Sequence, residues 1–190
     1  IVKPSMLGSS IGIKKVSDEK ELKHALNLAF KYDEMVIIEQ CLTDFREFNC
    51  AIFEDLVSDI EEVEVKSNIF TFEDKYQTHK TNHILPANID EELKNEIIEV
   101  TKKTSKSLRN ESIARIDYLY DINKERLYFN EINTIPGSYA FYLFDNAGIR
   151  FDIMLDMLIK EAILKKTKQK KLLRVFNSSI LNKKGLKLNK

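Results

Sequence analysis

The stretch that decides the fold is "ARIDYLYDINKERLYFNEINT", residues 114–134. Both of its halves alternate apolar with polar residues, as half-buried strands do, and "INKER" between them is typical of a hairpin turn. Side chains of a strand point alternately to opposite faces. Arg115 therefore shares one face with Asp117, and Glu131 shares one face with Asn133.

The register of this hairpin would bring four polar groups together. With a turn centred near Lys124, Asp117 lies opposite Glu131, and Arg115 lies opposite Asn133, with a cross-strand spacing of about 5 Å. Two carboxylates this close repel each other unless a cation lies between them. Oxygen ligands of this kind suit a hard divalent ion such as Mg²⁺, which also engages substrate phosphates. The alternative is a surface hairpin with a salt bridge from Arg115 to Glu131.

The composition predicts a folded protein with an acidic body. The chain has 190 residues, of which 43% are hydrophobic, enough for a core in one domain or in two small lobes. Acidic and basic residues number 30 each, but residues 165–190 hold ten Lys or Arg and no acid. Residues 1–164 therefore carry a net charge of −10, which argues against a main domain that binds nucleic acid.

The cysteines and the chain start indicate the cellular setting. Two cysteines, Cys41 and Cys50, are too few for a disulfide scaffold or a metal knuckle, and we interpret them as small buried residues. Neither an apolar run of membrane-spanning length nor a signal peptide is present, so we expect a cytoplasmic protein that does not enter a membrane. The chain opens on strand-like "IVKP" without an initiator Met, and we expect it to be a fragment.

The order of the expected elements predicts two α+β lobes with a cleft between them. Helices are expected over 17–33 (with Ser17 as N-cap), 90–108 and 150–166. Besides the hairpin, strands are expected over 1–3, 13–16, 34–42 (buried), 47–55 and 56–65. We divide the chain into a small lobe, 1–58, a large lobe with antiparallel strands, 59–164, and a basic tail, 165–190.

Two long loops are expected as well, over 67–88 and 134–149. A structureless segment as long as the first is either disordered or functional. We expect residues 66–84 to be mobile without nucleotide, and we interpret His79 and His83 as surface residues without a carboxylate partner.

The loop "KPSMLGSSIG" near the start has features of an anion site. Gly8 and Gly12 would let backbone N–H groups close on a phosphate, and Ser9 and Ser10 add hydroxyl donors. Lys3 can reach a phosphate as a point charge. The loop is not a Walker A motif, because the lysine comes first, and an ordinary tight turn is the alternative.

Five motifs in this order, "KPSMLGSSIG", "IIEQCL…REF", "DKY", "ARID" and "NEINTIPG", make residues 1–164 resemble the C-terminal ATP-grasp region of D-alanine–D-alanine ligases. The resemblance implies an α+β ATP-grasp fold with the nucleotide between the lobes. It implies an ATP-dependent ligase that joins two D-alanines through an acyl phosphate for peptidoglycan precursors. ATP and Mg²⁺, or Mn²⁺ in its place, would be the cofactors, and the partners would be small molecules rather than nucleic acid or membrane.

The resemblance also implies roles for single residues. Nucleotide binding would involve Lys3, Ser9, Ser10, Glu39, Gln40, Leu42 and Glu47. The metal ligands would be Asp117, Glu131 and Asn133. Catalytic positions would be Ser9, Lys75, Tyr76, Arg115 and Gly137, of which Lys75 and Tyr76 lie on a loop that closes over the site and excludes water. Arg115 would steady the transferring phosphoryl group.

The chain departs from the family pattern on the substrate side. Tyr142 stands where the family usually has a serine that binds the second substrate's carboxylate, and Tyr139 replaces a small hydroxyl residue. Substrate contacts are therefore assigned to Ser138 and Tyr142, and a different second substrate is one alternative function. The other is a nucleotide-binding module without catalysis, since we expect this chain to lack the preceding domain of the family and to be inactive in isolation. A homodimer of the intact protein is left open.

Overall fold

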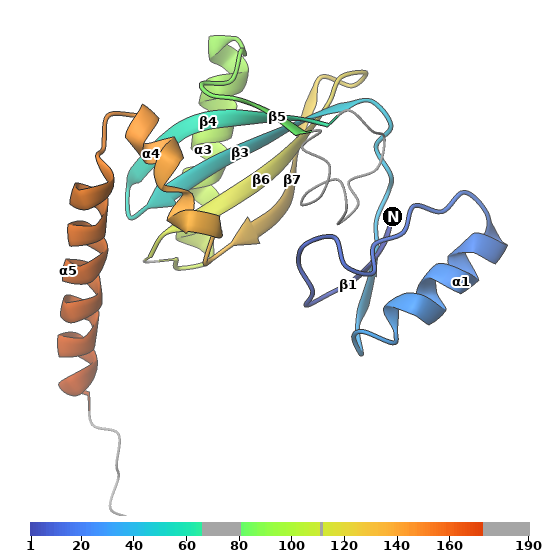
Figure 1. The fold of residues 1–190 in the computed structure, drawn as a ribbon, viewed down its shortest axis with the longest axis horizontal. Coiled ribbons are helices and arrows are strands. Elements are labelled where there is room, and N and C mark those ends of the chain that lie inside the picture. The colour runs from blue at the N-terminus through green and yellow to red at the C-terminus, as the bar shows by residue number, and fades with distance from the viewer. Residues whose placement is uncertain (66–80, 111, 173–190) are drawn as a thin grey trace, which may run out of the picture. The chain divides into compact units, whose positions relative to one another are not determined.

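The computed structural model describes residues 1–65, 81–110 and 112–172 (Figure 1). Its elements are β1 (Val2–Pro4), α1 (Glu19–Ala29), β2 (Val36–Ile38), β3 (Phe45–Phe53), β4 (Leu56–Val65), β5 (Thr81–Ile84), α3 (Glu91–Ser107), β6 (Ala114–Asp121), β7 (Arg126–Asn133), η1 (Gly137–Ala140), α4 (Phe141–Asn146) and α5 (Phe151–Lys170). The chain divides into two compact units, Ile1–Phe151 and Asp152–Lys190, and each is described by itself.

A five-stranded sheet dominates the first unit, with its strands in the order β5-β4-β3-β6-β7 (Figure 1). Every neighbouring pair is antiparallel, as predicted for the large lobe. Strand β5 lies inside the segment that we expected to be an irregular loop, and it pairs with β4. That part of the loop prediction is wrong, because the pairing partner is distant in sequence. Residues 66–80 lie outside the described part of the chain.

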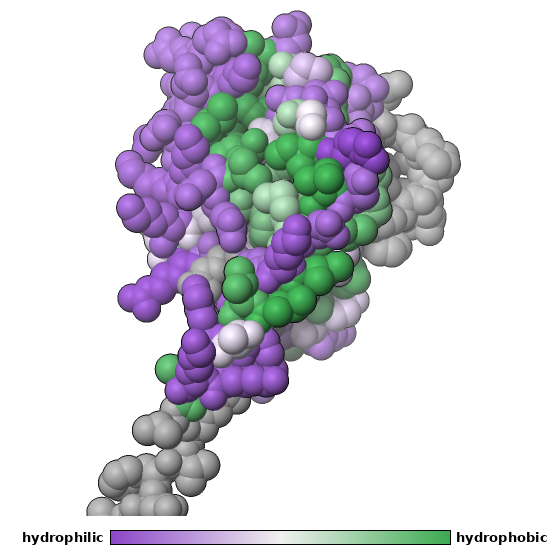
Figure 2. Space-filling view, turned by 90° about the vertical axis from the view of Figure 1, so that its left-hand side faces the viewer, coloured by the Kyte–Doolittle hydropathy of each residue, from purple (hydrophilic) through white to green (hydrophobic). Residues whose placement is uncertain are grey.

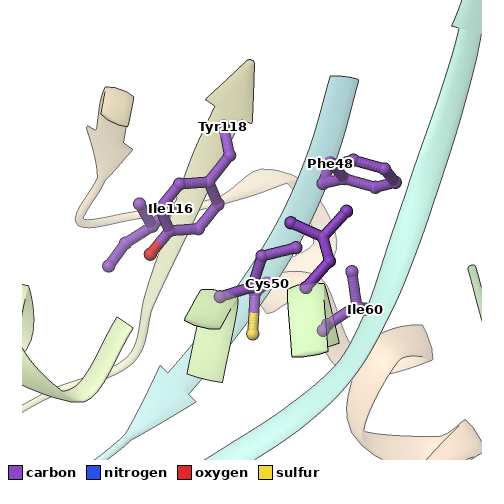
Figure 3. Packing of buried hydrophobic residues seen from close by; sticks show 7 residues of the cluster. Phe48, Cys50, Ile60, Ile116 and Tyr118 are labelled. Atoms are coloured by element: carbon purple, nitrogen blue, oxygen red, sulfur yellow. The ribbon is translucent and has the colours of Figure 1, made fainter. Parts of the chain in front are cut away.

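One face of this sheet packs against α3 and forms the main hydrophobic core. Strand alternation places a set of buried apolar side chains of β3, β4 and β6 on this face, where they form one cluster with Leu93 and Ile97 of α3. Figure 3 shows five of them packed together: Phe48, Cys50, Ile60, Ile116 and Tyr118. The phenol of Tyr118 is satisfied inside the core, because its oxygen lies 2.8 Å from Thr101 Oγ1. α3 begins at its predicted position, with Asp90 accepting a hydrogen bond from the Leu93 N–H.

The two cysteines should differ strongly in reactivity. Cys50 is buried in the core, and this burial raises the pKa of its thiol to about 11. Cys41 is partly exposed. Since the thiolate is the reactive form, iodoacetamide at pH 8 is expected to label Cys41 and to spare Cys50 in the folded protein. Mass spectrometry would check this, with both thiols labelled in denaturant as the control. Equal labelling of the two in the folded state would contradict the placement of Cys50.

The N-terminal part is a two-stranded antiparallel sheet, β1 with β2, packed against α1. Three sequence predictions need correction here. Residues 13–16 form no strand, only a single bridge from Lys14 to Val2. The N-cap of α1 is Asp18 rather than Ser17, because the Asp18 carboxylate accepts from the Glu21 N–H. β2 is not buried as expected: Ile37 and Ile38 are exposed.

The predicted boundary at residue 58 falls inside β4. Residues 45–58, which we assigned to the small lobe, belong to the five-stranded sheet, since β3 pairs with both β4 and β6. This assignment is therefore wrong, because alternation identifies a strand but not its partner. The loop expected over 134–149 is also partly helical, with η1 and α4 inside it.

Helix α5 extends further than predicted and takes in the first six residues of the segment we called a basic tail. Its exposed apolar residues include Ile159 and Ile163, which are four apart and share one face of the helix. Apolar residues also reach the surface elsewhere, and Figure 2 shows them beside polar ones on one side of the molecule. Within the described residues, none of the helices combines the length and the apolar character that crossing a membrane requires.

Candidate active site

A row of polar side chains crosses the sheet on the face opposite to α3. Glu61 of β4 is the register partner of Asn49 of β3, which is in turn the partner of Asp117 of β6. Asp117 is the partner of Glu131 of β7. We call these four residues the polar row. Since cross-strand partners on one face lie about 5 Å apart, the row gathers three carboxylates and an amide on four adjacent strands.

The hairpin β6–β7 has the register that the sequence predicted. Arg115 faces Asn133 and Asp117 faces Glu131, and the ladder has an irregularity directly after Asp117. Such irregularities often lie next to active sites, where they re-aim a side chain. The period of the two strands predicts which side chains share a face, and the register shift after Asp117 brings it opposite Glu131.

Arg115 and Asp117 form a two-pronged ion pair. Arg115 donates from Nε to Asp117 Oδ1 at 2.7 Å and from Nη2 to Oδ2 at 2.8 Å. The Arg115 side chain is 21% exposed and that of Asp117 only 6%. Burial alone would lower the pKa of Arg115, but the hydrogen bonds and the charge of Asp117 outweigh it and raise that pKa above its ordinary value. Arg115 is therefore a fixed cation, and the alternative pair with Glu131 is not what the structure has.

Asn133 links the two carboxylates of the hairpin. Its Nδ2 donates to Asp117 Oδ2 at 3.0 Å and to Glu131 Oε1 at 3.3 Å. The two acceptor oxygens surround one nitrogen, so they cannot be further apart than the sum of these distances. The Asn133 amide nitrogen thus lies between the carboxylates of Asp117 and Glu131, a position that favours a cation.

These residues fit a magnesium ion that keeps several waters. Mg²⁺ is usually held by one or two carboxylates together with substrate phosphates, rather than by a full cage of protein ligands. Two carboxylates and one amide oxygen meet that requirement, provided that Asn133 turns its oxygen inward. Among the described residues there is no group of three or more His, Cys, Asp or Glu side chains placed to hold a metal.

The predicted nucleotide-binding residues lie in two parts of the fold, around β1 and β2 and on β3. Lys3 of β1 and Glu39, which follows β2, form an ion pair with Nζ to Oε2 at 2.8 Å. Gln40 and Leu42 follow Glu39 along the chain, and Glu47 lies on β3. The structure therefore brings two of the predicted nucleotide-binding residues, Lys3 and Glu39, into direct contact.

The loop predicted to cover the phosphates has an unusual backbone. Ser9 and Ser10 have φ values of 55° and 58°, in the left-handed region. Gly12, with φ of 76°, is required for space as well, because a Cβ there would lie 2.9 Å from Pro4 Cγ. The Ile11 N–H donates to the Gly8 carbonyl at 3.2 Å, so residues 8–11 form a tight turn with Ser9 and Ser10 at its centre, as in the alternative named from the sequence.

The structure describes only some of the remaining predicted site residues. Lys75 and Tyr76 lie outside the described residues. Gly137 begins η1, followed by Ser138. Tyr142 of α4 reaches the polar row, because its hydroxyl donates to Glu61 Oε2 at 3.1 Å.

The sequence pattern missed the part of the site around Glu61. From the sequence we interpreted His83 as a residue without a carboxylate partner. This interpretation is wrong, because His83 Nδ1 lies 2.9 Å from Glu61 Oε1. His79 lies outside the described residues. Alternation along β4 places Glu61 on the face opposite Ile60, but only the pairing of β4 with β3 and β5 shows what it contacts.

Comparison with known proteins identifies the family. Residues 1–160 match the family model described as the C-terminus of D-ala D-ala ligase. D-alanine–D-alanine ligases of Thermosipho africanus and Thermosipho melanesiensis are 42% and 40% identical to the chain over 168 and 181 residues. These alignments cover 85% and 92% of the chain but only 45% and 49% of the relatives. The chain thus spans about half the length of the curated relatives it matches.

Solved structures agree with this result. The crystal structure of the VanG D-Ala:D-Ser ligase from Enterococcus faecalis aligns with a TM-score of 0.72 and 34% identity, over 84% of this chain and 48% of that one. The D-alanine–D-alanine ligase from Bacillus anthracis, complexed with ATP, aligns with a TM-score of 0.70 and 27% identity, over 88% and 54%. The α+β ATP-grasp fold predicted from the motifs is confirmed. The chain belongs to the family of the D-alanine–D-alanine ligase C-terminal region.

Proposed function

We propose that the intact protein is an ATP-dependent ligase that joins two D-alanines through an acyl phosphate, for peptidoglycan precursors. The observation that carries the proposal is the group on the hairpin β6–β7, where Arg115, Asp117, Glu131 and Asn133 converge. This group offers a fixed cation and a set of oxygen ligands on one face. Family membership supplies the reaction class.

In the first step, a carboxylate oxygen of one D-alanine attacks the γ-phosphorus of ATP, and ADP leaves. The transferring group spreads negative charge over its oxygens, and the protein's task is to position it and to balance that charge. Arg115 suits this task because Asp117 holds its guanidinium in one orientation. Asp117, Glu131 and Asn133 would hold Mg²⁺, or Mn²⁺ in its place, which would neutralise charge on the phosphates.

In the second step, the amine of the other D-alanine attacks the acyl carbon. The carbon–oxygen bond to the phosphate breaks, phosphate leaves with the carboxylate oxygen, and the amine loses a proton. No nucleophilic side chain of the protein is needed. An acyl phosphate is hydrolysed by water, so we assign Lys75 and Tyr76 to a segment that closes over the reaction.

For the nucleotide, we assign Lys3, Ser9 and Ser10 to the phosphates, Glu39, Gln40 and Leu42 to adenine, and Glu47 to the ribose. In this assignment, ATP takes over Lys3 from Glu39, its present partner. We infer a cytoplasmic protein. We also infer that it acts on small molecules rather than nucleic acid, because residues 1–164 carry a net charge of −10. The division into lobes and tail remains a prediction, with residues 45–58 moved to the large lobe.

A ligase with a different second substrate is the second candidate. The observation that favours it is Tyr142, whose hydroxyl donates to Glu61 and is therefore not free to donate to a substrate carboxylate. Among the structural relatives, the VanG enzyme is named a D-Ala:D-Ser ligase.

Phosphate release from ATP by the intact protein tests the proposal. With Mg²⁺ present, D-alanine is expected to stimulate release, and L-alanine is expected not to. A panel with D-serine and D-lactate as second substrates separates the two candidates, by analysis of the products. Phosphate release that is the same with and without amino acids, or absent with all of them, would contradict a D-amino-acid ligase.

A further inference from the structure

Glu61 is a buried carboxylate that none of the proposed reaction steps uses. It is 2% exposed and stands at the β4 end of the polar row. Three different elements donate hydrogen bonds to it: Asn49 Nδ2 of β3 at 3.0 Å, His83 Nδ1 of β5 at 2.9 Å and Tyr142 Oη of α4 at 3.1 Å. Glu61 of β4 thus connects the strands on both sides of β4, which are β3 and β5, with helix α4.

The side-chain amide of Asn49 is oriented so that its nitrogen faces the Glu61 carboxylate. Its Nδ2 donates to Glu61, and its Oδ1 is buried without a hydrogen-bond partner among the described residues. Leaving a buried carbonyl oxygen unsatisfied is unfavourable. If the amide were turned over, its oxygen would face the Glu61 carboxylate, and these two acceptors would repel each other. The contact with Glu61 therefore fixes the orientation of the Asn49 amide.

Glu61 is one half of a two-point attachment between β4 and α4. Tyr142 donates to Glu61, and Asn146 Nδ2 donates to Asp59 Oδ2 at 2.6 Å. Tyr142 and Asn146 are four residues apart, on one face of the helix, while Asp59 and Glu61 are two apart, on one face of the strand. The spacing of the two elements matches, so α4 is held at both of its ends.

The attachment at Tyr142 directly follows a strained turn. Ser138, Tyr139 and Ala140 have φ values of 51°, 52° and 50°, which non-glycine residues adopt only at a cost in free energy. Such conformations persist where the surrounding structure holds them in place. The turn begins four residues after Asn133, so the same chain segment that carries a metal-ligand candidate leads into it.

Tyr142 also lies within electrostatic reach of Arg115. Burial raises the pKa of the Tyr142 hydroxyl, and the negative charge of Glu61 raises it too, whereas the positive charge of Arg115 opposes the shift. The hydroxyl therefore keeps its proton and remains a donor to Glu61. The negative charge of Glu61 in turn contributes to the raised pKa of Arg115. The contact between Glu61 and Tyr142 is thus part of the surroundings of the candidate catalytic arginine.

We propose that Glu61 is a positioning residue which, through Tyr142, fixes the turn Gly137–Ala140 and thereby sets the affinity for the amino-acid substrates. This inference rests on the proposed ligase function. The nucleotide assignments lie on β1, in the loop after β1, after β2 and on β3, and the metal assignments lie on β6 and β7. The turn belongs to neither group, so its placement affects the amino acids rather than ATP.

Steady-state kinetics of the intact protein test the proposal. Tyr142→Phe removes one hydrogen bond to a carboxylate, and we expect the KM for amino acid to rise about 10-fold or more, with the KM for ATP within about 2-fold. Glu61→Gln keeps an acceptor oxygen for Tyr142 and should have a smaller effect. The double variant should match Tyr142→Phe alone, because both changes act on one contact.

Asn146→Ala is the matched control. It removes a hydrogen bond between the same two elements, at the end of α4 that is further along the chain from the turn, so it should lower thermal stability without changing the KM for amino acid. If Asn146→Ala and Tyr142→Phe change that KM equally, or if Tyr142→Phe leaves it unchanged in an active protein, the positioning role is overturned.

Hydrogen exchange gives a readout that does not depend on activity. The Tyr139 N–H donates to the Pro136 carbonyl, and the Phe141 N–H donates to the Ser138 carbonyl. Tyr142→Phe should accelerate exchange at these two amides, and Asn146→Ala should not. Unchanged exchange in Tyr142→Phe would overturn the inference. If instead exchange accelerates and the unaltered protein releases no phosphate with any amino acid, the proposed function fails while the positioning of the turn stands.

Discussion

Arg115→Ala is expected to lower the rate of amino-acid-dependent phosphate release by ~10³-fold or more. The physical reason is the loss of the fixed cation that balances charge on the transferring phosphoryl group. Asp117 holds this cation through two hydrogen bonds, so no neighbouring group can replace its geometry. Single-turnover measurement of phosphate release would report the loss directly, because it separates chemistry from product release.

Two further variants make this prediction specific. Arg115→Lys keeps the charge but cannot form the two-pronged contact, so it should recover much of the stability and little of the rate. Arg126→Ala is the control on the same hairpin, since Arg126 is exposed and stacks over Tyr128 at 5.3 Å from the ring centroid. Its rate should stay within about 2-fold of the unaltered protein. A fully active and folded Arg115→Lys protein would contradict the role given to the guanidinium.

Glu131→Gln is expected to raise the free Mg²⁺ concentration needed for half-maximal phosphate release by at least roughly 10-fold. Glu131 is exposed and makes only the 3.3 Å contact with Asn133 among the hydrogen bonds described above, so its loss should not unfold the protein. Removing one carboxylate lowers the negative charge that attracts the ion and takes away one ligand. The measurement is a Mg²⁺ titration at saturating ATP and D-alanine.

Glu125→Gln provides the matched control, because Glu125 is an exposed carboxylate in the turn of the same hairpin. It changes the net charge of the protein equally but lies outside the polar row. Only Glu131→Gln should shift the Mg²⁺ requirement. A shift of the same size in both variants would show a general charge effect and would argue against Glu131 as a ligand.

The sequence was sufficient to predict the central hairpin. Period-two alternation in β6 and β7 determines which side chains of each strand share a face. With a turn predicted near Lys124, it brings Arg115, Asp117, Glu131 and Asn133 together, and the observed pairing agrees with this. The turn itself pairs Asp121 with Arg126, so the agreement also depends on the register shift after Asp117, which alternation does not predict. The same local logic predicted a helix over 90–108, and the structure has α3 there, with Asp90 as its N-cap.

Features that depend on distant partners could not be predicted in this way. β5 is a strand because β4 offers it an edge, and α4 is held by contacts to β4 that are about 80 residues away in sequence. Glu61 looked like one more acid in "DIEEVEV", and only the sheet order reveals that Asn49, His83 and Tyr142 surround it. The boundary after residue 58 failed for the same reason, since β3 alternates like any half-buried strand whichever sheet it joins.

In the proposed reaction, a D-alanine carboxylate oxygen is transferred to phosphate through an acyl phosphate. The most direct measurement supplies the intact protein with ATP, Mg²⁺ and D-alanine whose carboxylate carries oxygen-18, and follows the isotope by mass spectrometry of the released phosphate. In the first step the labelled oxygen bonds to phosphorus, and in the second step its bond to carbon breaks. We predict one oxygen-18 atom in each phosphate formed, matched by one dipeptide. Phosphate without the label would mean that water, and not the substrate, attacks ATP, and it would contradict the account.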